Sequence, residues 1–239
     1  DGDILESPDI HIVLGDNYHF YFFDEYNGPK IAYNVWETTR YQDDFFEQLL
    51  TFDQMWVPTN WSRNNLIEQG YPAERVKVVP EGVNGNVFFP EEVELLDEYT
   101  DDRFKFIVFG RWDYRKSIPE IVEAFLNEFD SSEPVDLVLS VDNPFETAEY
   151  DGHPDGLNST EERLKFYGFN DERLKVKHFP SREDYIKYLK TGHVFLSCAR
   201  SEGWNLPLIE AMACGTPSIY SNWGAQLEFA IGKGHPVNP

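Results

Sequence analysis

The feature that most constrains the fold is a regular alternation between short apolar segments and segments with helical spacing. Several of the apolar segments end at glycine or proline, as expected of buried strands. The segments between them carry apolar residues three and four positions apart, which is typical of helices packed on a sheet. Strands that alternate with helices form parallel sheets, so the sequence predicts the α/β class. Strands are expected at residues 11–14, 31–35, 55–57, 76–79, 104–109, 135–141, 174–179, 193–198 and 216–220, and helices at residues 41–51, 60–69, 118–129 and 181–189.

A break in this pattern divides the chain into two α/β units. Residues 81–90 are rich in glycine and proline and predict a connection between them. The predicted units are residues 1–88 and residues 89–239. Residues 142–158 are polar and predict a loop or insertion. Only a short tail is expected after Gly224.

The charge of the chain limits its partners. Of its 239 residues 43 are acidic and 20 are basic, which gives a formal net charge of −23. A surface this acidic argues against binding to nucleic acid or to anionic membranes. It also means that any phosphate site must be built locally, from a few cations and N–H groups.

The cysteines and the absence of long apolar runs predict the compartment. Cys198 and Cys214 are the only cysteines, too few for a disulfide framework or a zinc site. We expect both to be core residues in a reducing compartment. The sequence has no secretory signal and no run of about 18 apolar residues. These observations predict a cytoplasmic protein without a membrane span.

Residues 201–217 carry the most informative pattern. Asn205 can cap a helix, Pro207 suits the first turn, and Gly215 ends the helix. The N–H groups of residues 203–206 then lie at or just before a helix N-terminus, which has free donors and a partial positive charge. Such a terminus favours a phosphate group.

Two glutamates, Glu202 and Glu210, flank this predicted helix start at a spacing of eight positions. A carboxylate repels an anion that it touches, so these two are better suited to accept hydrogen bonds from hydroxyl groups on either side of the phosphate. A molecule with hydroxyls, then phosphates, then hydroxyls is a nucleotide sugar. The alternative is an ordinary amphipathic helix with a solvated Glu210.

A second cluster follows the fifth predicted strand. Its loop begins with Gly110, which lets a ligand approach the backbone closely, and contains Arg111, Arg115 and Lys116. Ligands of open α/β sheets bind at the carboxyl ends of strands, and both arginine and lysine bind phosphate. The alternative is that these cations only pair with surface carboxylates.

Both clusters resemble elements of one enzyme family. Residues 202–210, followed by Ala-Met-Ala-Cys-Gly-Thr-Pro, resemble the E-x7-E element of retaining glycosyltransferases with the GT-B fold, family 4 in particular. The pattern Phe-Gly-Arg-x5-Ser resembles the Gly-Arg … Lys-Gly element of the same family, with Ser117 in place of the usual glycine. Ser117 and Glu120 also predict a capping box at the start of the following helix.

The resemblance implies a role for each residue of the two clusters. Arg111 and Lys116 would hold the donor diphosphate, Glu210 would bind the ribose hydroxyls and Glu202 would face the donor sugar. Arg111, Lys116 and Glu202 are therefore the predicted catalytic residues. The other predicted donor-binding residues are Gly110, Gly203, Trp204, Asn205 and Leu206, whose backbone would approach the phosphates and the sugar hydroxyls. The nucleobase would lie near His178 and Phe179, although His178 and His193 are more typical of structural histidines.

The first unit resembles the second half of the N-terminal domain in the same family. Its Tyr-Asn-Val-Trp-Glu sequence ends at Glu37, the predicted acceptor-side residue. The glycine-rich loop of the family's first half is not visible, so this unit is expected to be incomplete. The resemblance implies a GT-B architecture of two Rossmann-like parallel-sheet units with a cleft between them. Residues 1–88 would be the acceptor side and residues 89–239 the donor domain.

The predicted activity is transfer of a sugar from a nucleoside diphosphate sugar to an acceptor hydroxyl, with retention at the anomeric carbon. No His, Cys or carboxylate set has metal-ligand spacing, so no metal is expected, and no cofactor besides the donor substrate. The acceptor would be a carbohydrate or a lipid-linked or protein-linked group, and a UDP or GDP type of donor is left open. Two alternatives stay open: a non-catalytic nucleotide-sugar binding module, and another GT-B enzyme such as an epimerase, phosphorylase or sugar-phosphate synthase.

Overall fold

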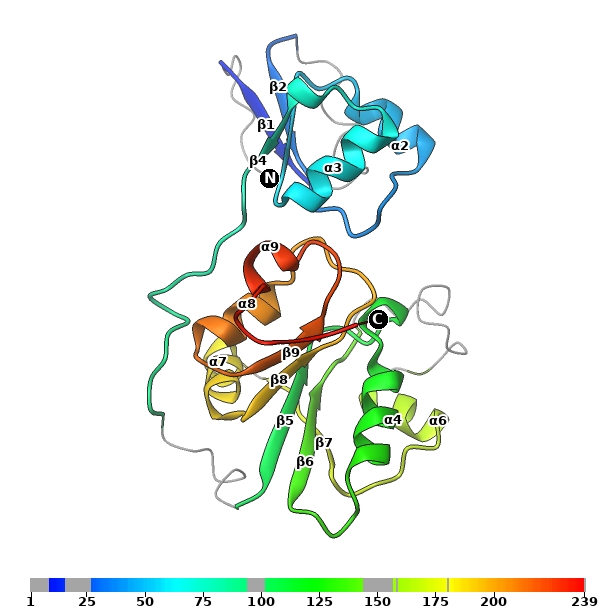
Figure 1. Ribbon diagram of the computed structural model, residues 1–239, viewed down its shortest axis with the longest axis vertical. Coiled ribbons are helices and arrows are strands. Elements are labelled where there is room, and N and C mark those ends of the chain that lie inside the picture. The colour runs from blue at the N-terminus through cyan, green and yellow to red at the C-terminus, as the bar shows by residue number, and fades with distance from the viewer. Residues whose placement is uncertain are drawn as a thin grey trace. The chain divides into compact units, whose positions relative to one another are not determined.

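The computed structural model describes residues 9–15, 27–93, 102–143, 157, 159–179 and 181–238, and it has two parallel sheets with helices (Figure 1). Its contacts divide the chain into two compact units. The first comprises residues 1–82 with the short segments 201–204 and 224–228; the second comprises residues 83–200, 205–223 and 229–239. The predicted α/β class is confirmed, whereas the boundary after residue 88 stays a prediction.

The first unit is built on a four-stranded parallel sheet in the order β1-β2-β3-β4. Its helices bury Phe45, Leu49 and Leu66 against strand residues such as Met55 and Val57, which forms the core of the unit. The elements are β1 (His11–Leu14), β2 (Lys30–Tyr33), α2 (Asp43–Leu49), β3 (Gln54–Val57), α3 (Asn60–Gln69), a 3₁₀ turn (Ala73–Arg75) and β4 (Val76–Val78).

The ends of α3 show how local sequence sets a helix. Thr59, the residue before the predicted helix at residues 60–69, is the N-cap, and its side chain accepts a hydrogen bond from the N–H of Ser62. Thr59 has extended backbone geometry, as a cap requires. At the other end Gly70 adopts a left-handed φ of 110° and stops the helix directly after the predicted last residue, Gln69.

The second unit contains a six-stranded parallel sheet in the order β10-β9-β8-β5-β6-β7. The strands are β5 (Phe104–Phe109), β6 (Val135–Ser140), β7 (Leu174–Val176), β8 (Val194–Ser197), β9 (Ser218–Ser221) and β10 (His235–Val237). Its helices are α4 (Ile118–Glu128), α6 (Thr160–Phe166), α7 (Arg182–Thr191) and α8 (Leu206–Ala213), and α9 (Leu227–Ala230) follows β9.

The expectation of a mere tail after Gly224 was wrong. The chain forms α9 there and then returns to pair β10 with the edge of β9. Pro236 in the middle of β10 hid this strand in the sequence, because proline is tolerated only in strands at an edge. The predicted loop at residues 142–158 lies almost wholly outside the described residues.

Successive residues of β5 point to opposite faces of the second sheet. Phe106 and Val108 pack in a core with α4 and α6, and Figure 1 shows these two helices on one side of the sheet and α7 on the other. Phe109 points toward α7, with its ring 5.6 Å from that of Tyr185. This alternation is the period of two that a strand buried on both faces requires.

The end of the predicted connection at residues 81–90, together with Glu91 just after it, packs on α7. The Arg182 guanidinium lies 5.4 Å from the ring centroid of Phe88. Lys190 Nζ lies 4.2 Å from the ring centroid of Phe89 and 2.9 Å from a carboxylate oxygen of Glu91. Two cation–π contacts and an ion pair therefore attach this segment to the second unit.

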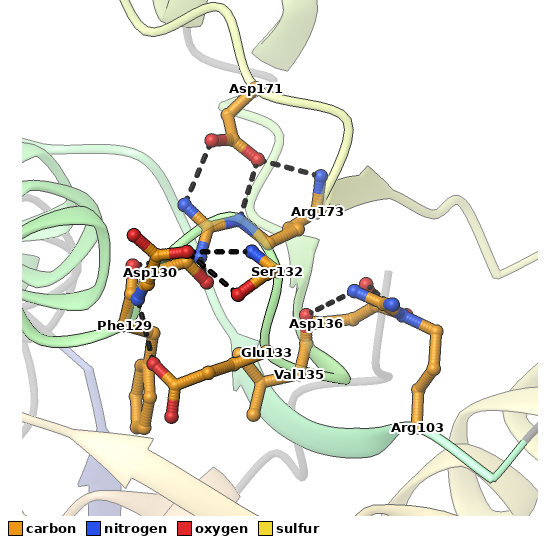
Figure 2. Close-up of polar contacts among 9 residues, drawn as sticks. All are labelled: Arg103, Phe129, Asp130, Ser132, Glu133, Val135, Asp136, Asp171 and Arg173. Carbon is orange, nitrogen blue, oxygen red and sulfur yellow. Dashed lines mark hydrogen bonds and ion pairs between the residues drawn. The ribbon is translucent and has the colours of Figure 1, made fainter.

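A polar cluster stabilises the amino ends of the strands in the second sheet (Figure 2). Arg173, just before β7, binds both carboxylate oxygens of Asp171 at 2.8 Å. It also donates to the carbonyl oxygens of Phe129 and Asp130 at the C-terminus of α4. A cation at that position satisfies helix carbonyls and complements the helix dipole.

The predicted structural roles of the cysteines and of His193 are confirmed. Both cysteines are free; Cys214 is buried, and burial raises the pKa of the Cys198 thiol to about 11. His193 Nδ1 accepts a hydrogen bond from the Lys105 N–H, and its ring stacks on Phe104. Across the described segments, every helix is too short or too polar to cross a membrane.

Candidate functional site

The strand order of the second sheet locates a switch point. From β5 the chain moves outward to β6 and β7, then returns and moves the other way through β8, β9 and β10. This is the doubly wound order, and the direction reverses between β5 and β8. Ligands of such sheets bind outside the carboxyl ends of the strands at the reversal. The segments at this edge are the loop after β5 and the start of α8 after β8.

The loop after β5 brings a lysine over a glycine. Gly110 has a φ of 145°, in the region that only glycine adopts readily. A Cβ atom at this position would lie 3.6 Å from Lys116 Cε and 3.9 Å from its Nζ. The Lys116 side chain therefore extends back across the half-buried Gly110 backbone, so one cation and one stretch of main chain lie side by side.

Asp113 organises the three cations of this loop. Its buried carboxylate caps the 3₁₀ turn Tyr114–Lys116 by accepting from the Lys116 N–H at 3.0 Å. The same carboxylate lies 3.0 Å from Arg111 Nε and 3.8 Å from an Arg115 nitrogen. With three cationic side chains and one carboxylate, the loop has a formal net charge of about two positive charges. Sequence analysis missed Asp113, although an aspartate three residues before a turn end is a capping signal.

The predicted capping box at Ser117 and Glu120 was wrong. Ser117 has a φ of 54° and makes no side-chain cap to α4. It ends the preceding 3₁₀ turn by donating its N–H to the Tyr114 carbonyl oxygen, in a left-handed conformation rather than the extended one of a usual cap. Glu120 instead pairs with Arg200. A positive φ explains why glycine suits this position and why serine is strained there.

One hydrogen bond and one cation–π contact connect the cationic loop with the chain that leaves β8. The Arg200 N–H donates to the Arg115 carbonyl oxygen at 2.7 Å. Its guanidinium pairs with Glu120 and stacks over the Tyr114 ring at 4.4 Å. The loop after β5 and the segment that leads toward α8 thus form one hydrogen-bonded edge of the second unit.

Helix α8 begins as predicted, with Asn205 as its cap. Asn205 has a left-handed φ of 82°, and its side-chain oxygen accepts from the Leu208 N–H at 3.4 Å. Its amide nitrogen donates to Ser197 Oγ at the end of β8, which fixes the side chain. Because Pro207 has no N–H, the Leu206 N–H is the first-turn donor that the cap leaves for another acceptor. The predicted stop at Gly215 also holds, with a φ of 83°.

Glu210 lies on the second turn of α8 and is held from α7. Tyr185 donates its hydroxyl to Glu210 Oε2 at 2.6 Å, and Arg182 lies 3.8 Å from Oε1. The Glu210 side chain is 14% exposed, so the alternative of a solvated glutamate is wrong. Burial raises the pKa of its carboxyl, while Tyr185 and Arg182 act to lower it. Tyr185 and Arg182 were not singled out in the sequence because they lie at least 25 positions from Glu210.

Glu202, Gly203 and Trp204 immediately precede the cap of α8 in the chain. All three are buried, and the contact-based division counts them with the first unit. Their predicted contacts with a donor sugar stay a prediction.

The first unit has its own pocket of about 350 Å³ at the carboxyl ends of β1 and β2. Glu37 is one of its lining residues, with Gly15, Asn34 and Trp36. Asn34 donates to the Gly15 carbonyl and accepts from the Tyr41 hydroxyl, and Trp36 stacks on Tyr41 at 4.8 Å. The wall beside Glu37 is therefore rigid, as a binding surface requires.

The region proposed for the nucleobase divides into two parts. His178 Nδ1 lies 2.6 Å from Asp142 and its ring is largely exposed, so it is a partnered surface histidine. Phe179 packs against Phe109 and Tyr188 in the aromatic layer under α7. In the part of the chain that the structure describes, no three His, Cys, Asp or Glu side chains gather in a way that could hold a metal ion.

A family model described as glycosyl transferases group 1 matches residues 97–234, more than half of the chain. The chain belongs to this family. The match covers both the cationic loop and the start of α8, so the group 1 glycosyltransferase resemblance read from these motifs is confirmed.

Two curated relatives are sugar-phosphate synthases by name. The chain is 27% identical over 184 residues to the probable sucrose-phosphate synthase of Thermosipho melanesiensis, covering 75% of this chain and 40% of that protein. It is 26% identical over 167 residues to the mannosylfructose-phosphate synthase of Agrobacterium fabrum, covering 66% of this chain and 35% of that protein. The chain thus spans less than half the length of these relatives.

Solved structures confirm the GT-B fold of this group 1 chain. The Anabaena protein HepE in complex with UDP and glucose superposes with a TM-score of 0.75 at 15% identity, covering 97% of this chain and 64% of HepE. The trehalose-6-phosphate synthase OtsA gives a TM-score of 0.75 at 17% identity, covering 98% of this chain and 62% of OtsA. At these identities the likeness concerns the fold alone.

Proposed function

We propose that this group 1 chain transfers a sugar from a nucleoside diphosphate sugar to an acceptor hydroxyl, without a metal ion and with retention at the anomeric carbon. The observation that carries the proposal is the hydrogen bond between the cationic loop and Arg200, in the segment that follows β8, at the switch point of the second sheet. In a chain with a net charge of −23, two excess positive charges on one loop are a local attraction for a diphosphate.

In this proposal Arg111 and Lys116 bind the diphosphate, with the Gly110 backbone and the Leu206 N–H beside it. As the glycosidic bond breaks, negative charge grows on the leaving diphosphate. Cations and N–H groups already fixed around it stabilise that charge without reorganisation. Asp113 fixes Arg111 and the turn that carries Lys116, so it would act as the positioning residue of the loop. These groups do the work that a divalent cation does in other phosphate sites.

The two glutamates have separate roles. Glu210 accepts hydrogen bonds from the ribose hydroxyls, and Glu202 faces the donor sugar. Glu37, in the pocket of the first unit, serves the acceptor, a carbohydrate or a lipid-linked or protein-linked group. Because Glu210 contacts the nucleoside, Glu202 and Glu210 do not act as the close acid and nucleophile pair of retaining glycosidases.

A sugar-phosphate synthase is the second candidate. The names of the two relatives from Thermosipho and Agrobacterium favour a phosphorylated sugar as the acceptor. The donor chemistry would be unchanged. Product analysis with a plain sugar and with its 6-phosphate separates the two candidates.

Binding of nucleoside diphosphates tests the diphosphate site. UDP, GDP and ADP are titrated by calorimetry, with UDP first because HepE was crystallised with UDP. Lys116→Ala should weaken the best ligand roughly tenfold or more, since it removes a charge-assisted contact to phosphate. Lys175→Ala, which removes one exposed lysine from β7, is the matched control and should change nothing. Equal affinity in Lys116→Ala would remove Lys116 from the site.

Two measurements test the reaction. Turnover of the donor with an acceptor should continue after treatment with EDTA, and NMR of the product should show the anomeric configuration of the donor. A product of opposite configuration would exclude retention. A protein that binds nucleotide but never releases nucleoside diphosphate from the nucleotide sugar would instead be a binding module.

A further inference from the structure

Glu210 is held by a single short hydrogen bond from a neighbouring helix. The Tyr185 hydroxyl donates to Oε2 at 2.6 Å, the length of a strong bond to an ionised acceptor. Among the described residues, the partner of Oε1 is the mostly exposed Arg182 guanidinium at 3.8 Å, beyond hydrogen-bonding distance. The two carboxylate oxygens therefore have different surroundings: one is fixed by a phenol, and the other has room for a further donor.

The tyrosine that makes this bond is itself held in place. Its ring lies 5.6 Å from the ring of Phe109, 5.8 Å from that of Phe179 and 6.4 Å from that of Phe88. These rings come from the end of β5, from the segment after β7 and from the segment at residues 83–93. Contacts with three rings leave the phenol few rotamers, so the position of its hydroxyl oxygen is fixed before any ligand arrives.

A carboxylate with a fixed orientation can distinguish between ligands that a freely rotating carboxylate would bind equally well. A carboxylate has about four lone-pair positions, and a ribose presents two neighbouring hydroxyls as donors. With one lone pair of Oε2 taken by Tyr185, the remaining positions face a defined direction. A site built to bond a hydroxyl rejects the analogue that lacks it more strongly than a flexible site does.

We propose that Tyr185 is the positioning residue for Glu210, and that the pair selects ribonucleotide donors over 2′-deoxyribonucleotide donors. Tyr185 does not touch the substrate; it acts by orienting the carboxylate that does. The inference rests on the proposed function, since it assumes that a nucleoside lies at Glu210.

The hydrogen bond also sets the pH range of binding. Burial raises the pKa of the Glu210 carboxyl, and the Tyr185 hydrogen bond and the Arg182 charge oppose that rise. The other titratable group facing Glu210 is Cys214, one turn further along α8, whose thiol pKa is raised chiefly by burial. Loss of the Tyr185 hydroxyl should therefore raise the Glu210 pKa further. Because the carboxylate is the acceptor, ribonucleotide affinity should be lost at a higher pH in that variant.

The test is the affinity ratio between a nucleotide and its 2′-deoxy form. UDP, GDP and ADP are each titrated beside the deoxynucleotide, and the tightest pair is then used with the variants. Tyr185→Phe keeps the ring and removes the hydroxyl. It should lower the preference for the ribonucleotide roughly fivefold, the size expected for one hydrogen bond to a charged group acting indirectly. Affinity for inorganic pyrophosphate should not change.

A matched variant and a double-mutant cycle separate positioning from general damage. Tyr71→Phe removes a hydroxyl that donates to the Phe52 carbonyl in the first unit, and should leave the ribose preference unchanged. In a Glu210→Gln background, Tyr185→Phe should have no further effect on the ratio, because the group through which it acts has already been altered.

The outcomes are distinct. If the wild-type chain binds none of the nucleotides, the proposed function and this inference both fail. If it binds them through Lys116 but Tyr185→Phe retains the full ribose preference and pH profile, this inference is overturned and the proposed function stands. An effect of Tyr185→Phe that persists in the Glu210→Gln background would also overturn it, because Tyr185 would then act by another route.

Discussion

At the residue scale, Ser117 departs from the family pattern at a position where the backbone is left-handed. Ser117 stands where the group 1 motif usually has glycine, and its φ of 54° is the left-handed conformation that glycine adopts without cost. The geometry is imposed by its neighbours, because Asp113 closes the turn before it and α4 begins directly after it. The strain is thus local to one residue beside the proposed diphosphate site.

We therefore expect Ser117→Gly to stabilise the protein by about 1 kcal/mol, the typical cost of a side chain in the left-handed region. Urea denaturation measures this as a higher midpoint with an unchanged slope. Ser181→Gly is the matched control. Ser181 has a φ of −143° and caps α7, so the same substitution there should cost a few tenths of a kcal/mol, about the usual loss for a cap replaced by glycine. A loss of stability in Ser117→Gly would contradict the strain argument.

At the scale of elements, the two edges of the second sheet have different tasks. The carboxyl ends of β5 and β8 carry the loop and the helix start proposed to bind the donor. The amino ends carry the cluster around Arg173, where one guanidinium joins the start of β7 to the end of α4 (Figure 2). Stability and binding should therefore respond to different substitutions.

Arg173→Ala should lower the free energy of unfolding by about 3 kcal/mol, because it leaves a carboxylate and two helix carbonyls without their partner in a buried site. Arg40→Ala, which breaks an exposed pair with Asp43, should cost less than about 0.5 kcal/mol. Nucleotide affinity of the Arg173 variant, measured where it remains folded, should match the wild type. A weakened nucleotide affinity would show that the two edges are coupled.

His193 makes the joint between β5 and β8 sensitive to pH. Burial, with a smaller effect of Lys105, lowers the His193 pKa, and its neutral ring accepts the Lys105 N–H. The unfolded histidine takes up a proton near pH 6.5, before the folded one does, so stability falls as pH drops below about 6.5. His193→Gln should lose this part of the pH dependence in denaturation measured from pH 7.5 to 5.5. An identical slope in the variant would exclude His193 as its source.

At the scale of the whole molecule, the acidity of the chain opposes its proposed ligand. A formal net charge of −23 repels a nucleoside diphosphate at long range, while the cationic loop attracts it at short range. Salt screens the long-range part first, since the Debye length is about 10 Å at 0.1 M. The same screening relieves repulsion among the surface carboxylates.

We expect both effects to appear in a salt series from 10 to about 300 mM NaCl, a range that spans Debye lengths of roughly 30 to 6 Å. The midpoint of urea denaturation should rise, and the association rate of UDP should rise or stay level. The neutral nucleoside uridine is the control and should show no such trend. A steep fall in the UDP association rate with salt would mean that the local positive potential extends well beyond the loop.

The sequence by itself determined the features that depend on residues close together in the chain, above all where helices and strands begin and end. Apolar period, caps and stops predicted most of the strands and helices, including Asn205 and Gly215 at the two ends of α8, but not α6, α9 or β10. The family motifs identified both segments of the candidate site, residues 110–117 and 202–210, because each motif lies within one short stretch of sequence.

Only the tertiary structure decided which distant residues meet. The strand order that brings the loop after β5 beside the segment leading to α8 depends on pairing between strands far apart in the chain. Three further contacts also join residues that are far apart in the chain. They are the hydrogen bond from Tyr185 to Glu210, the ion pair of Glu120 with Arg200 and the pairing of β10 with β9. Residues close together in the sequence determine where a helix or strand begins and ends. Contacts between distant elements depend on how the whole chain packs, so a short stretch of sequence cannot predict them.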